Sequence, residues 1–208
     1  YESGFKVDEK VFLDLNSDNP EDISKASALG LSRFAEIYKK IKPDLLVLLG
    51  DRYEILSAVI PACFQRIPIA HIHGGEVTEG AIDEAIRHSI TKFSHLHFVA
   101  NEEYRKRVIQ LGENPSRVFN FGGMSIDAIR SITFFNKKEI EEELKISFLD
   151  KALLITFHPE TLDIEKSQIQ LSNLIRALTE LSKTTLVFTL PNADPGNNSL
   201  TDIINKFV

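Results

Sequence analysis

The 208-residue chain lacks the residues and segments on which several protein classes depend. Its one cysteine, Cys63, can form neither an internal disulfide nor a cysteine zinc site, which fits a reducing compartment. The longest apolar run, Leu45 to Leu49, is far shorter than the roughly 18 residues that span a bilayer. With 24 basic against 30 acidic residues, the net charge of -6 disfavours nucleic acid or an anionic membrane as a partner. These deficits predict a soluble, cytoplasmic protein.

Several sequence motifs of known chemistry are also missing. No G-x-G-x-x-G follows an expected strand, which disfavours a dinucleotide cofactor. There is no P-loop and no G-x-S-x-G elbow, so a nucleoside triphosphatase and an α/β-hydrolase are both disfavoured. We therefore expect neither a cofactor nor a resident metal ion.

The residues that are present alternate between strand-like and helix-like patterns. Continuous apolar runs of strand length are typical of parallel strands buried on both faces, and helical periodicity separates them. We expect strands at 11–15, 45–49, 67–72, 95–100, 117–121, 151–157 and 184–190. Helices are expected at 23–41, 53–65, 83–93, 102–111, 164–181 and 200–208, with another from about 125. This order predicts an α/β fold with doubly wound parallel sheets.

Composition changes once along the chain, in the charged segment 136–150. We interpret this segment as a linker or solvated helix between a Rossmann-like domain at 1–135 and the start of a second one at 151–208. The chain begins with Tyr1 rather than Met, and its last helical pattern stops abruptly. We therefore expect a piece of a longer polypeptide, with two domains facing a cleft and parts of both missing.

Candidate functional residues follow from the rule that parallel sheets bind ligands outside the carboxyl ends of their strands. Four groups of polar residues stand at such ends, two in each expected domain. They are Asp51; His71, His73 and Glu76; His158; and Asn192 and Asp194.

Each of these groups also has a structural interpretation. Asp51 could be a simple turn former. The imidazoles of His71 and His73 lie on one side of an extended chain and could hold a metal, although H-x-H alone is a weak signal. Gly74 and Gly75 allow either a close approach to a ligand or a tight turn.

A second cluster begins the helix expected at 83–93. Asp83 and Arg87 are four residues apart, as are Glu84 and His88, so each pair shares a helical face. Ordinary ion pairs explain these spacings equally well. His95 and His97 are interpreted as structural. The loop 192–198 could supply a helix cap or attract a phosphate.

Three strings carry a resemblance to a known family. They are Leu49-Gly50-Asp51-Arg52-Tyr53-Glu54, His71-Ile72-His73-Gly74-Gly75-Glu76 and Ile82-Asp83-Glu84-Ala85-Ile86-Arg87-His88-Ser89-Ile90-Thr91-Lys92. With Thr156-Phe157-His158-Pro159-Glu160-Thr161 and Pro191-Asn192-Ala193-Asp194, the chain resembles the UDP-N-acetylglucosamine 2-epimerases, most of all the hydrolysing branch that serves sialic acid synthesis.

The resemblance implies a fold like the GT-B glycosyltransferases, with the nucleotide sugar between two domains, and an incomplete chain. It implies loss of the C2 proton and departure of UDP, then addition of water to give N-acetylmannosamine. Asp51 and Asp83 match catalytic carboxylates of the family, and His158 matches a family histidine that contacts the diphosphate or assists its departure. With Glu84, which lies beside Asp83, these are the expected catalytic residues. Where the family often has a third carboxylate this chain has His73, so either His73 or Glu76 takes that role. The expected substrate-binding residues are Arg52, His71, Gly74, Gly75, Arg87, His88 and Asn192.

Other interpretations remain open at this stage. The same reaction on a UDP-2,4-diacetamido-trideoxy sugar, for legionaminic acid, and non-hydrolysing 2-epimerisation are the nearest. A glycosyltransferase of the same fold, a dinuclear metallohydrolase and a non-catalytic nucleotide-sugar binding module are more remote. The resemblance also implies a homodimer or homotetramer.

Overall fold

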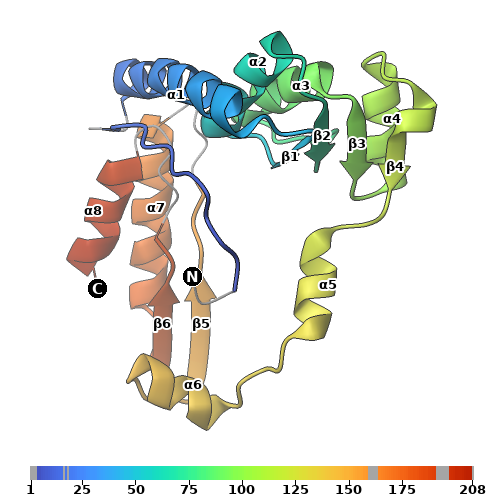
Figure 1. Cartoon of the computed structure of the whole chain (residues 1–208). Helices are drawn as coiled ribbons and strands as arrows, with labels where there is room; N and C mark the ends of the chain where they lie inside the picture. Colours follow the sequence, from blue (N-terminus) through green and yellow to red (C-terminus); the bar gives the residue numbers. More distant parts are fainter. Residues whose placement is uncertain (1–3, 16, 18, 159–163, 191–196, 208) are drawn as a thin grey trace. The chain divides into compact units, whose positions relative to one another are not determined.

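A computed structural model of the chain describes residues 4–15, 17, 19–158, 164–190 and 197–207. These residues form an α/β structure with parallel sheets, which confirms the predicted fold class. The chain divides into two compact units, Tyr1–Asp127 and Ala128–Val208, each of which is described by itself (Figure 1). The division falls within helix α5 (Met124–Ser131), slightly before the expected end of the first domain. The expected domain limits stay a prediction.

The first unit is built on a four-stranded parallel sheet. Its strands are β1 (Leu46–Leu49), β2 (Ile69–Ile72), β3 (Leu96–Val99) and β4 (Val118–Asn120), and they lie in the sheet in chain order (Figure 1). Helices α2 (Tyr53–Phe64), α3 (Asp83–Phe93) and α4 (Glu102–Gln110) connect them, with a 3-10 turn, η1 (Pro115–Arg117), before β4. Because right-handed crossovers in such an order all pass over one face, these three helices share a face of the sheet.

The main core of this unit lies between that face and the helices. Leu48 and Ile69 of the sheet pack with Val59 of α2 and Ile90 of α3. The opposite face is apolar as well, and the side chain of Val47 on it is more than half exposed. Side chains alternate along a strand, so His71 shares the helix-covered face with Ile69. His97 is the register partner of His71 on β3 and lies on the same face.

Helix α1 (Pro20–Ile41) precedes β1 and packs against α2. Its start is capped by Asn19, whose side chain accepts a hydrogen bond from the Asp22 amide at 2.8 Å. The strand expected at 11–15 is wrong, because these residues pair with no sheet edge. They run along α1 instead, where the Arg33 guanidinium donates to the Phe12 carbonyl.

The second unit contains a two-stranded parallel sheet, β5 (Lys151–Ile155) and β6 (Thr184–Phe188). Helix α6 (Lys137–Leu144) precedes it and begins with a capping box made by Asn136 and Glu139. Helices α7 (Ile164–Thr179) and α8 (Asn197–Phe207) form a small core through Leu171, Leu200 and Ile204. In the part of the chain that the structure describes, no helix is long and apolar enough to cross a membrane.

Candidate functional site

The carboxyl ends of β1 and β2 and the first turns of α3 bring polar side chains together in the first unit. Gly50 has a positive φ of +93° and ends β1, so the chain turns there and presents Asp51 beyond the strand. The loop after β2 supplies His73 and Glu76, and α3 supplies Glu84 and Arg87. These residues contact one another at this edge, whereas the expected convergence with His158, Asn192 and Asp194 of the second unit stays a prediction.

Arg87 is at the centre of this cluster and is almost fully buried, with 3% of its side chain exposed. Its Nε donates to Asp51 Oδ2 at 2.9 Å, and a terminal nitrogen donates to the same oxygen. Its NH1 donates to Glu84 Oε2 at 2.9 Å and to the carbonyl of Glu76 at 2.8 Å. Its NH2 also donates to Thr78 Oγ1 at 2.8 Å. One guanidinium thus joins α3 to the ends of two strands.

Glu84 is held as a carboxylate by the donors around it. Thr78 N–H donates to its Oε2 at 2.8 Å, and Oε1 lies 3.0 Å from His88 Nε2. Burial by itself raises the pKa of Glu84, but the Thr78 amide, His88 and Arg87 together lower that pKa below its ordinary value. Glu84 is therefore ionised near neutral pH.

His73 and Glu76 form a separate pair. His73 Nδ1 lies 2.6 Å from Glu76 Oε1, and both side chains are partly exposed. The backbone of His73 has a φ of +66°, a region that residues other than glycine rarely adopt. Backbone strain of this kind is common where a side chain must be aimed in one direction. The pair is thus a carboxylate-oriented imidazole beside the Arg87 cluster.

The glycines after His73 are explained by packing against the protein itself. A Cβ on Gly75, whose φ is +79°, would lie 2.5 Å from the carbonyl oxygen of Tyr104 in α4. A Cβ on Gly74 would lie 3.1 Å from His71 Nδ1 and from Thr91 Oγ1. Gly74 and Gly75, which were expected to contact a ligand, are therefore also the points where the loop packs closely against α3 and α4.

His71 was expected to bind substrate, and the structure places it behind the site. Its side chain is fully buried, Nε2 lies 2.8 Å from the carbonyl oxygen of Gly50, and Nδ1 lies 3.3 Å from Thr91 Oγ1. Thr78 and Thr91 are partners that sequence reasoning missed. Thr91 could have been found, because it is four residues after Arg87 on the same helical face.

The other predicted residues have different surroundings. The Arg52 side chain pairs with Glu54 at 3.2 Å and lies over the Tyr53 ring, 5.7 Å from its centroid. Asp83 is the first residue of α3. His158 is exposed and follows β5 in the second unit, whose position relative to Asp51 is not described. Asn192 and Asp194 lie outside the described residues.

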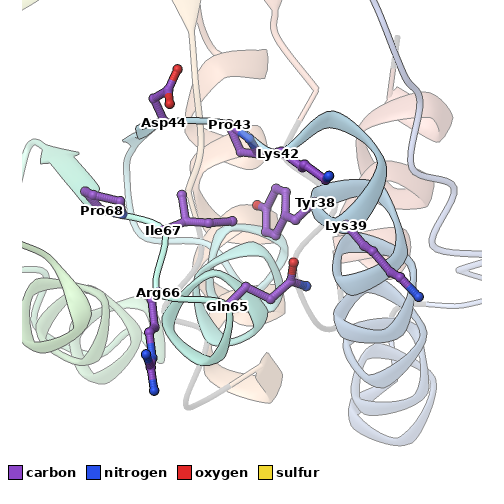
Figure 2. A pocket seen from close by; sticks show the side chains of 9 residues that line it. All are labelled: Tyr38, Lys39, Lys42, Pro43, Asp44, Gln65, Arg66, Ile67 and Pro68. Atoms are coloured by element: carbon purple, nitrogen blue, oxygen red, sulfur yellow. The ribbon is translucent and has the colours of Figure 1, made fainter.

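Two hollows of the first unit differ in their position along the sheet. One of about 480 Å³ lies at the amino ends of β1 and β2, away from Asp51. Figure 2 shows Tyr38 in this hollow, with the charged ends of Lys39, Arg66 and Asp44 pointing away from its ring in different directions. Charges that diverge in this way do not form a binding site for one ionic group.

The other hollow, of about 210 Å³, lies at the carboxyl ends of β2 to β4. Its walls are mainly apolar and come from Ile72, Phe98, Phe121, Met124 and Asp127, with Gly122. Ile72 pairs with Phe98, and because side chains alternate along a strand, both lie on the sheet face opposite His71 and His97. Within the described ranges, no three His, Cys, Asp or Glu side chains gather closely enough to hold a metal ion.

Comparisons with known proteins agree with this arrangement. Residues 1–208 match the family model described as UDP-N-acetylglucosamine 2-epimerase. The chain is 42% identical, over 99% of its length and 54% of the relative's, to a protein of Campylobacter jejuni named GDP/UDP-N,N'-diacetylbacillosamine 2-epimerase (hydrolyzing). It is 38% identical, over 100% of its length and 52% of the relative's, to polysialic acid biosynthesis protein P7 of Escherichia coli. The chain thus spans about half the length of the curated relatives it matches.

Among solved structures, the chain resembles the UDP-GlcNAc 2-epimerase of Neisseria meningitidis bound to UDP-GlcNAc, with a TM-score of 0.69 and 20% identity. The match covers 89% of this chain and 53% of that one. The likeness shows a shared GT-B-like α/β fold, and this chain spans about half the length of that structure. With the family match over its whole length, it confirms the resemblance inferred from the sequence strings: the chain belongs to the UDP-N-acetylglucosamine 2-epimerase family.

Proposed function

We propose that the protein to which this chain belongs is a hydrolysing 2-epimerase that acts on a UDP-linked 2-acetamido sugar. The observation that carries the proposal is the cluster at the carboxyl ends of β1 and β2. There Arg87 holds Asp51 and Glu84 beside the His73–Glu76 pair. Removal of a proton next to a departing phosphate needs such a combination of a base, fixed carboxylates and hydrogen-bond donors.

The two kinds of acidic group have different roles in this proposal. Arg87 pairs with Asp51 and Glu84, and Glu84, whose pKa is lowered, holds a fixed negative charge near the sugar. His73 is bound to Glu76 through Nδ1, so Nε2 is the ring nitrogen turned toward other partners. We assign His73 as the base that takes the C2 proton, with Glu76 stabilising the imidazolium that forms.

The remaining steps involve residues assigned by resemblance. After the C2 proton is lost, the C1–O bond to UDP breaks and a 2-acetamidoglucal forms. Water then adds to C1 and a proton is added to C2 on the opposite face, which gives the epimer and free UDP. His158 is proposed to assist the departing diphosphate, and Asn192 to line the nucleotide side. Asp83, Arg52 and His88 complete the proposed sugar contacts.

Two substrates are candidates for this chemistry. The sequence resemblance favours UDP-N-acetylglucosamine, whose product feeds sialic acid synthesis. The Campylobacter jejuni relative is named for N,N'-diacetylbacillosamine, a 2,4-diacetamido-trideoxy sugar that carries a methyl group where N-acetylglucosamine has a hydroxymethyl group. The 42% identity to this relative supports the diacetamido sugar as the preferred substrate.

The test is proton NMR in D2O on the full-length protein with each UDP-sugar separately. We expect free UDP and a 2-epimer that carries deuterium at C2, with a higher kcat/KM for the diacetamido sugar. Release of UDP without deuterium at C2 would contradict the mechanism, and a UDP-linked epimer would place the protein in the non-hydrolysing branch. Equal rates with and without EDTA would exclude the metallohydrolase.

A matched pair of variants separates base from orienting group. His73→Gln should lower kcat roughly 10²–10⁴-fold, as expected for loss of a general base. Glu76→Gln should lower it less, because the imidazole remains, and should shift the pH profile of kcat. A His73→Gln enzyme of near wild-type rate would transfer the role to another group. The proposal also includes a homodimer or homotetramer in the cytoplasm, and light scattering would give the oligomeric state.

A further inference from the structure

A second layer of contacts lies directly behind Asp51 and involves none of the residues that the proposed reaction uses. It consists of Gly50 at the end of β1, His71 in β2, Gly74 in the following loop and Thr91 in α3. We refer to these four residues as the strand-end brace. His71 and Thr91 are both fully buried, so neither is open to a bound ligand.

The hydrogen bonds of the brace define the state of the His71 ring. A carbonyl oxygen can only accept, so the 2.8 Å contact with Gly50 places the proton on Nε2. Nδ1 then accepts from the Thr91 hydroxyl at 3.3 Å. The ring is therefore a neutral imidazole with both nitrogens engaged inside the protein. Burial lowers the pKa of His71 to about 4, in agreement with this state.

Gly50 is the residue whose conformation determines where Asp51 points. Its φ of +93° is one that glycine adopts readily, so the backbone there is not fixed by its own sterics. Two contacts hold it. The Gly50 N–H donates to the Ile72 carbonyl at 3.2 Å, and the Gly50 carbonyl accepts from His71. Without the imidazole, one of the two contacts that fix this turn is lost.

Helix α3 therefore reaches the end of β1 twice. Arg87 contacts the Asp51 carboxylate directly, and Thr91, one turn later, contacts the Gly50 carbonyl through His71. Gly74 leaves the space for this, because a Cβ there would press on both His71 Nδ1 and Thr91 Oγ1. A backbone contact and a side-chain contact from one helix together fix both the place and the direction of Asp51.

We propose that His71 is a positioning residue, which with the Thr91 hydroxyl holds the Gly50–Asp51 turn so that the Asp51 carboxylate meets Arg87 and the reacting sugar. This assignment replaces the substrate contact expected for His71 from the sequence. Its kinetic consequences rest on the proposed function, since they assume that Asp51 acts on the substrate. Its structural consequences, the proton position and the hydrogen bonds, do not.

The kinetic test uses the full-length protein and a pair of nearly isosteric variants. Thr91→Val removes the hydroxyl without changing the volume, and Thr91→Ser keeps it. We expect Thr91→Val to lower kcat about tenfold, since one buried acceptor loses its donor, while KM stays within about twofold. Thr91→Ser should restore kcat to within about twofold of wild type. Equal kcat for the valine and serine variants would overturn the proposal.

His97 offers a matched control for His71. It is equally buried, is the register partner of His71 on β3, and contacts Glu113, on the far side from Asp51. His71→Gln and His97→Gln both remove a buried imidazole from the same sheet face. We expect only the His71 variant to lower kcat, by about tenfold or more. An equal loss in both variants would mean that any buried imidazole matters only for packing, and the proposal would be wrong.

A measurement without turnover separates this proposal from the proposed function. If the wild-type protein releases UDP from none of the sugars, the proposed function fails and the brace is judged by ¹⁵N NMR of the histidine rings. We expect His71 at neutral pH to carry its proton on Nε2, with Nδ1 unprotonated, in wild type and in Thr91→Ser. A proton on Nδ1, or a charged ring, would overturn the brace.

Discussion

Replacement of Arg87 by methionine tests the cluster most directly. Methionine has a similar length and no charge, so Arg87→Met leaves the apolar packing nearly intact and removes every hydrogen bond of the guanidinium. Asp51 and Glu84 then face each other without a counter-ion. Breaking a fully buried ion pair in this way costs roughly 3–5 kcal/mol. Here the two carboxylates are 27% and 31% exposed, and water reduces the loss to about 2–3 kcal/mol.

The assay is urea unfolding followed by circular dichroism at pH 7, because the chain has no tryptophan to report by fluorescence. Arg33→Met is the control, since Arg33 is only partly buried and pairs with the more exposed Asp14, and the loss of unfolding free energy should be within about 0.5 kcal/mol. The double variant Arg87→Met/Asp51→Asn should recover about 1 kcal/mol, because one of the two unpaired charges is gone. An Arg87→Met protein as stable as Arg33→Met would refute the reasoning.

The pH dependence of stability tests whether the loss in Arg87→Met comes from the unpaired carboxylates. The pKa of folded Glu84 is lowered, so its contribution to stability is present above the carboxyl pKa of the unfolded chain and is lost as pH falls through the folded value. In Arg87→Met that contribution is weaker at neutral pH. The difference in unfolding free energy between wild type and variant should therefore narrow as pH falls below the carboxyl pKa of the unfolded chain, about 4.3, and through the lowered pKa of folded Glu84. A difference that stays constant down to pH 3 would contradict the assignment of the loss to these charges.

Three further predictions concern other contacts. His71 faces His97, Asp51 and Arg87, and burial lowers its pKa from 6.5 to about 4, so between these values the unfolded chain takes up a proton that the folded chain does not. As pH falls from 6.5 to about 4, the free energy of unfolding measured in urea should therefore decrease by up to roughly 3 kcal/mol. A free energy that stays constant over this range would contradict the buried neutral ring. Gly75→Ala should destabilise the first unit by about 2 kcal/mol more than Gly122→Ala. Both glycines have a positive φ, but only a Cβ at position 75 would clash with the backbone, at the Tyr104 carbonyl oxygen. Equal melting temperatures for the two variants would refute this prediction. In the full-length protein, Asp51→Asn and His158→Ala should lower turnover roughly 10²–10⁴-fold with unchanged circular dichroism, and near wild-type UDP release by either would remove that residue from the mechanism.

The fold was predictable because its signals are local. Each expected strand from 45–49 onward corresponds to an observed strand, and the Asn19 cap and the helix after it follow from capping and periodicity. The strand expected at 11–15 failed for a non-local reason. Alternating apolar residues form a strand only where a sheet edge is available. Here the Leu13 side chain packs closely against Gly30 of α1 instead.

The site was predictable only in its location. The rule for strand ends brought together Asp51, His73 and Glu76 without any knowledge of their partners. It could not distinguish the partly exposed residues at this edge of the sheet from the buried ones. His71 and His73 are two residues apart and share a motif, yet one is fully buried and the other is partly exposed, because the positive φ at His73 turns the chain after β2. Such a turn leaves no periodic trace in the sequence.

Helix α3 explains why the cluster depends on spacing rather than on any single residue. Glu84, Arg87 and Thr91 follow one another at intervals of three and four residues, so they form a single row along the helix. The row faces the ends of β1 and β2, which are adjacent parallel strands and so end at the same level. A rotation or shift of α3 would therefore disturb the carboxylates, the guanidinium and the brace together. A one-residue insertion after the exposed Ser89, between Arg87 and Thr91, should abolish UDP release even though the helix persists by circular dichroism. Full activity of this variant would show that the row does not position Asp51.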